Sequence, residues 1–334
     1  MKKIFLSVLL LISMSSNAQN ALDKGLCAIN KSSGEAIIGF LANDELGGRE
    51  PNTVGGRIAA EYLKASLQNL GIKPLDDTYF QGFSAFASGK GKRGKASFYV
   101  HPDSIAAYKK NAVYRELPMR NVLGMIEGKN RNEYVVVGAH YDHLGTDPTL
   151  AGDKIYNGAD DNASGVSAVL QLAKAFVASG QQPERNVIFA FWDGEELGLL
   201  GSEYFMLHCP FTSSIKGYLN FDMIGRNKFE DNPNYVVYFY TESHPLFGDW
   251  LKEDIKKYKL QLAPNYRPWD KPIGGSDNGS FALRNIPIIW YHTDGHPDYH
   301  QPGDEANKIN YNKLIEITKS SFLNLWRLAN EKTY

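Results

Sequence analysis

Acidic and imidazole side chains follow several apolar, strand-like segments of this sequence, each at the point where the segment ends. A single group of this kind is typical of an ordinary loop or helix start, as for the adjacent acids Glu195 and Glu196. Several such groups at the ends of successive strands are hard to obtain by chance. Acidic side chains that cluster together repel one another unless a cation lies among them. The groups are His140 and Asp142 after YVVVGA, Asp161 in NGADDNASG, Glu195 and Glu196 after NVIFAFW, Asp222 after YLNF, and His300 in HPDYH.

The types of these side chains indicate which cation they would hold. Two imidazoles with several carboxylates and no thiolate motif suit zinc, and manganese or cobalt could substitute for it. The candidate ligands outnumber those of one catalytic zinc, which keeps a position for water. A carboxylate with two oxygens can bridge a pair of ions, so we expect two zinc ions with Asp161 as the bridge. Each ion would then have one imidazole and one further carboxylate.

Strand-like and helix-like segments alternate along most of the chain, and they must position these groups. This alternation predicts an α/β fold of three layers (α/β/α), in which helices cover both faces of a central mixed, largely parallel sheet. Sites in such sheets form beyond the carboxyl ends of the strands, where the polar groups above are expected. The expected helices are 33–43, 53–70, 164–179, 197–207, 245–258 and 311–330, and the expected strands 96–100, 122–126, 134–140, 186–191, 215–223, 235–240 and 286–292.

Size and charge limit the classes of function. The chain has 334 residues, and 43% of them are hydrophobic, enough for a large core. Its net charge is 36 − 37 = −1, which gives no electrostatic case for binding nucleic acid or an anionic membrane. We expect a single domain over residues 19–334 with a helical lead-in.

The N-terminus has the three-part layout of a secretory signal. Lys2 and Lys3 precede an apolar run that is short for a bilayer, and small polar residues ending at Ala18 follow it. We expect a cleaved signal peptide over residues 1–18 and a secreted or periplasmic protein; a retained anchor is the alternative. The two cysteines, Cys27 and Cys209, could pair in such a compartment.

Six motifs in order make the sequence similar to peptidase family M28, the zinc aminopeptidases with paired metal ions. The resemblance covers about residues 33–330, essentially the whole mature chain, and the lead-in LANDELGGREPNTVGG also resembles that of the family. One motif alone would be weak, but six in the order and rough spacing of the family are specific. They are AHYDHLG, IYNGADDNASG, FWDGEELGLLGS, LNFDMIGR, GGSDNGSF and DYHQPGDEANKINY.

The resemblance implies a particular set of metal ligands. His140 and Asp222 would hold one zinc ion, and Glu196 and His300 would hold the other. Asp161, the second acid of ADDN, matches the bridging ligand.

The resemblance also implies roles around the metal. Asp142 matches the acid that orients His140, and Glu195 matches the general base. Tyr299 matches a tyrosine that donates a hydrogen bond to the tetrahedral intermediate in some relatives, although packing at the wall of the site explains it equally well. Asp277 matches an acid near the site, whereas Asn278 departs from the histidine that the family often has.

The resemblance leads to a secreted aminopeptidase acting on peptides with a free N-terminus. One alternative is a glutaminyl cyclase, a relative on the same fold that uses a single zinc ion and that FWDGEE also resembles. A second is a binding protein that has lost catalysis, although every ligand and the base are present. A serine hydrolase is disfavoured because no G-x-S-x-G motif occurs.

Overall fold

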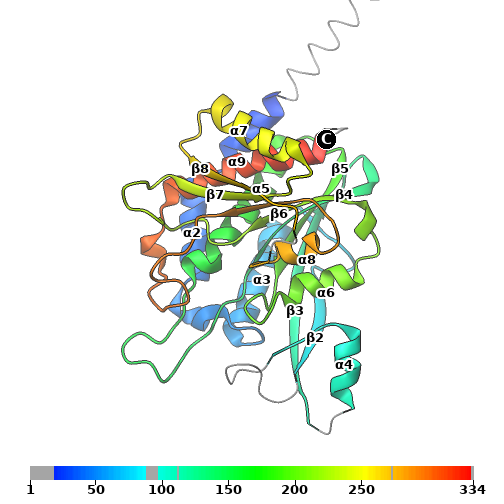
Figure 1. Cartoon of the computed structure of the whole chain (residues 1–334), viewed down its shortest axis with the longest axis vertical. Coiled ribbons are helices and arrows are strands. Elements are labelled where there is room, and N and C mark those ends of the chain that lie inside the picture. The colour runs from blue at the N-terminus through cyan, green and yellow to red at the C-terminus, as the bar shows by residue number, and fades with distance from the viewer. Residues whose placement is uncertain (1–18, 88–96, 111–112, 272–273, 332–334) are drawn as a thin grey trace, which may run out of the picture.

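One mixed β-sheet runs through the part of the chain described by the structure, a computed structural model that covers residues 19–87, 97–110, 113–271 and 274–331 (Figure 1). Within these ranges nine strands pair in the order β1-β3-β5-β4-β6-β9-β7-β8, with β2 also on β3. The central pairs are parallel, whereas β1, β2 and β5 run antiparallel to β3, and β7 to β9. The strands are β1 (Lys73–Pro74), β2 (Phe80–Ala87), β3 (Arg115–Ile126), β4 (Asn130–His140), β5 (Arg185–Trp192), β6 (Ile215–Phe221), β7 (Tyr235–Tyr240), β8 (Ala263–Pro268) and β9 (Ile288–His292).

The central strands are apolar because both faces of the sheet are covered. In β4, Val135 and Val137 belong to one hydrophobic core, and Val136 between them belongs to the core on the opposite face. Every residue of β5 is buried. Continuous apolar runs are typical of such doubly covered parallel strands, and the predicted three-layer α/β fold is confirmed.

Helices cover the two faces unequally. The larger core lies under α2, α3, α5, α7 and α9, and the smaller one under α6 and α8, while α4 packs on β2 at the end of the molecule away from α7 and α9 (Figure 1). No helix of the described residues has the length and apolar character to cross a bilayer. A first helix covers residues 19–28, and the helices after it are α2 (Lys31–Leu41), α3 (Val54–Asn69), α4 (Pro102–Lys109), α5 (Gly165–Ser179), α6 (Leu200–His208), α7 (Pro245–Tyr258), α8 (Asn278–Ala282) and α9 (Tyr311–Asn330).

Most predicted elements occur, with three differences. The helix expected from residue 197 begins at Leu200, because a turn closed by the carbonyl of Glu195 precedes it. The strand expected over 96–100 was wrong: Tyr99 forms only an isolated bridge to Phe86, and residue 96 lies outside the described ranges. Strands β1, β2 and β8, helix α4 and the helix over residues 19–28 were not predicted. The predicted signal peptide, residues 1–18, also lies outside the described ranges, and Cys27 and Cys209 are free thiols.

A buried arginine joins the segments that carry the site. The guanidinium of Arg49 donates hydrogen bonds to the backbone carbonyls of Leu41, Tyr141, Asn157 and Gly158, at 2.5 to 3.0 Å. Burial lowers its pKa to about 10, so it stays charged at neutral pH. One side chain thus links α2, the end of β4 and the loop that leads to the Asp160-Asp161 pair.

We expect Arg49→Met to lower the free energy of unfolding by about 3 kcal/mol, because four buried carbonyls would lose their donor. Denaturant unfolding of the purified protein measures the change. The matched control is Arg57→Met, since Arg57 donates to one exposed carbonyl, that of Asn52, and should cost less than about 1 kcal/mol. Equal losses in the two variants would contradict the linking role of Arg49.

Candidate metal centre

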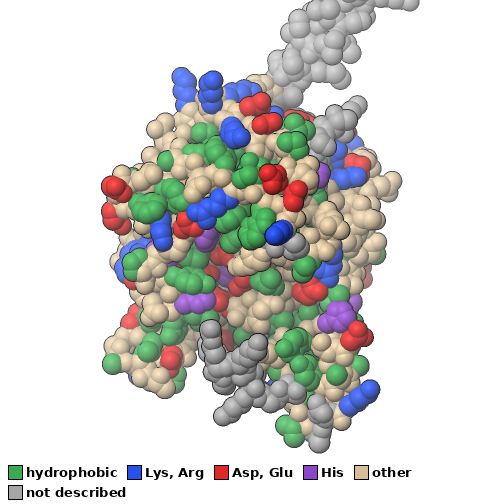
Figure 2. All heavy atoms as spheres, in the orientation of Figure 1, with side chains coloured by type: hydrophobic (Ala, Val, Ile, Leu, Met, Phe, Trp, Pro, Cys, Tyr) green, Lys and Arg blue, Asp and Glu red, His purple; other side chains and the backbone are tan. Residues whose placement is uncertain are grey.

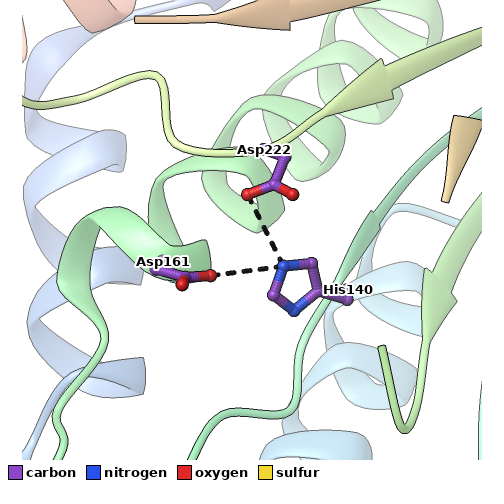
Figure 3. Close-up of side chains that lie close together, drawn as sticks. All are labelled: His140, Asp161 and Asp222. Atoms are coloured by element: carbon purple, nitrogen blue, oxygen red, sulfur yellow. Dashed lines mark ion pairs between the residues drawn. The ribbon is translucent and has the colours of Figure 1, made fainter. Parts of the chain in front are cut away.

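The first group of donors lies at the carboxyl ends of β4 and β6. His140 Nε2 is 3.3 Å from Asp161 Oδ1 and 3.6 Å from Asp222 Oδ1, and the three side chains point toward one another from different segments (Figure 3). All three residues are buried. The parallel strands place His140 and Asp222 at the same edge of the sheet, as the sequence predicted for this fold.

The second group shares Asp161 with the first. His300 Nε2 is 3.1 Å from Asp161 Oδ2 and 3.2 Å from Glu196 Oε2. Asp161 therefore turns one carboxylate oxygen toward each group. The structure thus brings together all five residues that the sequence singled out as metal ligands.

The donor atoms fit zinc in type and spacing. Two ligand atoms bound to one tetrahedral zinc ion at about 2.0–2.1 Å lie about 3.3 Å apart. The four donor distances of the two groups, from 3.1 to 3.6 Å, are close to that value. Without a cation, these carboxylates would lie against one another in a buried place, which is costly.

The two imidazoles partly compensate the acids when no metal is bound. Burial alone would lower the pKa of His300, but its hydrogen bonds to Asp161 and Glu196 raise it to about 10. Burial likewise opposes protonation of His140, and the nearby Glu195, Asp161 and Asp222 carboxylates outweigh it and raise its pKa well above the ordinary value. Both rings therefore carry a proton at neutral pH in the metal-free protein.

We expect zinc binding near pH 7 to release at least about two protons, because each imidazole must lose its proton to act as a ligand. Zinc affinity should fall as the pH falls, since protons then compete more strongly. Calorimetric titration with zinc in buffers of different ionisation enthalpy counts the protons released. Binding without proton release would argue against His140 and His300 as ligands.

A cavity of about 220 Å³ opens beside the donor groups. Glu195 lines it, with Oε2 4.0 Å from His140 Nε2. Burial, together with the Asp222, Glu196 and Asp277 carboxylates, raises the pKa of Glu195 well above its ordinary value, although His140 opposes the shift. In Figure 2, acidic and histidine side chains are visible together near the middle of the face drawn. The other lining residues are Asp161, Asp222, Met223, Gly275, Trp290, His292, Gly295, Tyr299 and His300.

Tyr299 lies at the rim of this cavity. Its side chain is 46% exposed, and its ring stacks on that of His300 with 3.9 Å between the centroids. Burial of the ring and the surrounding acids, first of them Asp161, raise the pKa of Tyr299, so its hydroxyl keeps its proton. A protonated hydroxyl at this place can donate a hydrogen bond into the cavity.

The carboxylate of Asp142 lies near His140 but accepts its hydrogen bonds from other residues. Its carboxylate accepts from the backbone N–H groups of Glu195, at 3.1 Å, and Glu196, at 3.4 Å. The Nδ1 atom of His140 is 3.2 Å from the backbone carbonyl of Asp142 and 3.8 Å from the carboxylate. Asp142 therefore fixes the turn that carries the two glutamates, a contact that the sequence did not predict.

The loop that carries His300 is held to the segment that carries Asp161. The carboxylate of Asp304 accepts from the backbone N–H groups of Asp160 and Asp161, each at 3.0 Å, and His296 Nε2 is 3.3 Å from Asp160 Oδ2. We call these contacts the loop clasp. Neither His296 nor Asp304 had a role assigned from the sequence, although His296 lies in HPDYH and Asp304 in DYHQPGDEANKINY.

His143 also had no assigned role and lies next to the second group. Its Nδ1 atom is 2.7 Å from Glu196 Oε1 and 3.9 Å from Asp161 Oδ2. The ring is completely buried and makes an edge-to-face contact with the ring of His300, with the centroids 5.8 Å apart. The AHYDHLG motif contains this histidine, but only the folded arrangement reveals its contact with Glu196.

Comparison with known proteins places this site in a family. The profile of Peptidase family M28 matches residues 121–323, more than half of the chain. Leupeptin-inactivating enzyme 1 of Streptomyces exfoliatus is 32% identical over 170 residues, which are 50% of this chain and 34% of that protein. Leucine aminopeptidase 2 of Trichophyton equinum is 28% identical over 278 residues, which are 80% of this chain and 49% of that protein. The chain belongs to peptidase family M28.

Solved structures share the fold at low sequence identity. The Bacillus subtilis zinc aminopeptidase BSAP has a TM-score of 0.69 at 15% identity, covering 92% of this chain and 97% of that one. Porphyromonas gingivalis glutaminyl cyclase has a TM-score of 0.63 at 17% identity, covering 89% and 98%. These two likenesses establish the fold alone. The chain spans at most about half the length of the two curated relatives above.

Proposed function

We propose that this protein is a two-zinc aminopeptidase that removes N-terminal residues from peptides. The observation that carries the proposal is the position of Asp161, which turns Oδ1 toward His140 and Oδ2 toward His300. This is the arrangement of a carboxylate that bridges two metal ions. Membership of family M28 and the relative named leucine aminopeptidase support the same activity.

In this proposal His140 and Asp222 hold one zinc ion, Glu196 and His300 hold the other, and Asp161 bridges them. The bound zinc pair would polarise the scissile carbonyl, acidify the attacking water and anchor the free α-amine of the substrate. Manganese or cobalt could replace zinc, since the donors are oxygens and imidazoles only.

Glu195 is the general base in this mechanism. Its carboxylate lines the cavity beside His140 and takes a proton from the attacking water, then passes the proton to the departing amine. The Glu195 carboxylate must be ionised to take this proton. Activity should therefore fall on acidification, as Glu195 becomes protonated.

Tyr299 would donate its hydroxyl proton as a hydrogen bond to the oxyanion of the tetrahedral intermediate. Its place at the rim of the cavity and its protonated state support this role. Its stacking on His300 supports the simpler alternative of packing. Tyr299→Phe separates the two, since it keeps the stacked ring and removes the donor.

We propose that the protein acts outside the cytoplasm. The signal-like segment over residues 1–18 supports export to the periplasm or the medium, with cleavage after Ala18. The substrates would then be extracellular or periplasmic peptides with a free N-terminus. The low net charge supports neither nucleic acid nor an anionic membrane as a partner.

A glutaminyl cyclase is the second candidate, supported by the structural neighbour of that name. One zinc ion at Asp161, Glu196 and His300 would suffice for it. We rank it second because the protein also has the first donor group, in which His140 and Asp222 join Asp161.

The proposal is tested by digesting a peptide library with the purified, zinc-loaded protein and reading the products by mass. Stepwise loss of N-terminal residues, abolished by a chelator, with about two zinc ions per chain, is expected. One zinc ion per chain, with ammonia released from N-terminal glutamine and no cleavage, would select the cyclase. Neither reaction in the loaded protein would select a binding protein without catalysis.

A further inference from the structure

His143 occupies a place in the site that neither the ligand set nor the general base explains. Its Nδ1 atom lies 2.7 Å from Glu196 Oε1, while His300 Nε2 lies 3.2 Å from the other oxygen, Glu196 Oε2. The two histidines therefore hold opposite oxygens of one carboxylate. Oε1 of Glu196 is thus hydrogen-bonded by His143, whereas Oε2 faces the other donors of the second group.

The distance distinguishes a hydrogen bond from two ligands of one ion. Two donors on one tetrahedral zinc ion lie about 3.3 Å apart, whereas a charge-assisted N–H to carboxylate bond is about 2.7–2.9 Å long. The 2.7 Å between His143 and Glu196 fits the hydrogen bond. His143 Nδ1 is also 3.9 Å from Asp161 Oδ2, farther than the donor distances within either group.

The surroundings hold the His143 ring in this orientation. The side chain is completely buried, and a Cβ on Gly158 would come within 2.5 Å of its ring, so the ring packs directly against the backbone there. An ionised carboxylate only accepts hydrogen bonds, so Nδ1 must carry the proton. Nε2 has no hydrogen-bond partner within the described residues, which fits its being the ring nitrogen without a proton.

We propose that His143 is a positioning residue for Glu196: its Nδ1–H holds Oε1 so that Oε2 faces the metal ion shared with Asp161 and His300. The inference rests on the proposed two-zinc function. His143 would fix the orientation of Glu196, a ligand of the second donor group. Within the described part of the chain, it makes no hydrogen bond or ion pair with His140 or Asp222, the other ligands in the first group. Outer partners of metal ligands commonly change metal affinity by about 10- to 100-fold.

Two substitutions separate donation from packing. His143→Leu keeps an apolar side chain of similar size and removes the donor. His143→Asn is smaller, but its amide nitrogen is as many bonds from Cα as the Nδ1 of histidine, so it keeps a donor. We expect His143→Leu to weaken one of the two zinc sites about 10- to 100-fold without changing the other, and His143→Asn to stay within about threefold of the wild type.

The readout is the pair of zinc dissociation constants, measured by competition with a chromogenic chelator. Equal weakening in both variants, or wild-type affinity in His143→Leu, overturns the inference. Loss of one zinc ion in both variants overturns it in favour of His143 as a ligand. A wild-type chain that binds fewer than two zinc ions would instead refute the proposed two-zinc function, whatever the variants do.

A second measurement needs no substitution. In wild-type protein labelled with ¹⁵N-histidine and loaded with ¹¹³Cd, we expect the Nδ1 atom of His143 to carry a proton and to show no coupling to cadmium. Coupling to cadmium, or a proton on Nε2 instead, would overturn the inference even if His143→Leu failed to fold.

Discussion

Glu195→Gln should reduce kcat by about 100- to 10,000-fold while leaving the zinc content unchanged, because the amide cannot take the proton of the attacking water. Glu195 lies at the rim of the donor groups and belongs to neither, with Oε2 4.0 Å from His140 Nε2. Its side chain lines the cavity, where a water and a scissile carbonyl would meet. Steady-state hydrolysis of an aminoacyl chromophore, together with metal analysis of the same sample, measures both quantities.

Glu203→Gln is the matched control for this substitution. Glu203 lies on the following helix, α6, and pairs with Arg284 at 2.9 Å rather than with the donor groups. Its activity should be close to that of the wild type. If Glu195→Gln lost zinc and kept residual activity, the roles of Glu195 and Glu196 would have to be exchanged.

Asp161→Asn should lower the zinc content from about two ions per chain to at most about one, and reduce activity at least about 100-fold. An amide has one neutral oxygen in place of two anionic ones, so it can serve only one of the two groups. Its NH₂ would face either the first group, at His140, or the second, at His300. Metal analysis after equilibration with buffered zinc checks the stoichiometry.

The control for Asp161→Asn is Asp249→Asn, the same chemical change at an exposed position of α7. This variant should keep both zinc ions and full activity. Retention of two tightly bound zinc ions by Asp161→Asn would exclude a bridging carboxylate. The ligand set would then have to be assigned again.

The sequence predicted the elements whose pattern is local and strong. Helices α7 and α9 and strand β7 have the predicted bounds, because their apolar periods are long and their ends are marked by turn residues. Strand β8 was missed because Pro264 and Pro268 and the absence of an apolar alternation make its sequence, APNYRP, look like a loop. It lies at the edge of the sheet, where proline is tolerated, and only its pairing with β7 makes it a strand.

Part of the candidate site could be predicted from the sequence, because some of its residues directly follow recognisable strands. Residues at strand ends, such as His140 and Asp222, can be found because the fold places all parallel strand ends at one edge. The contacts of His143 and Asp304 depend on which way a loop side chain points and which backbone amide it reaches. No periodicity in the sequence encodes such a contact, and 143 residues separate Asp304 from Asp161.

The loop clasp has a consequence for how zinc binds to the metal centre. His300 comes from a loop, yet Asp304 and His296 hold that loop against the Asp160-Asp161 segment through contacts of the protein alone. The entropy of arranging the donors is thus lost when the chain folds, and little remains to be lost when an ion arrives. Removal of the zinc ions should therefore leave a folded protein with its donor atoms still in place. Such a protein should bind zinc again when the metal is added, without refolding.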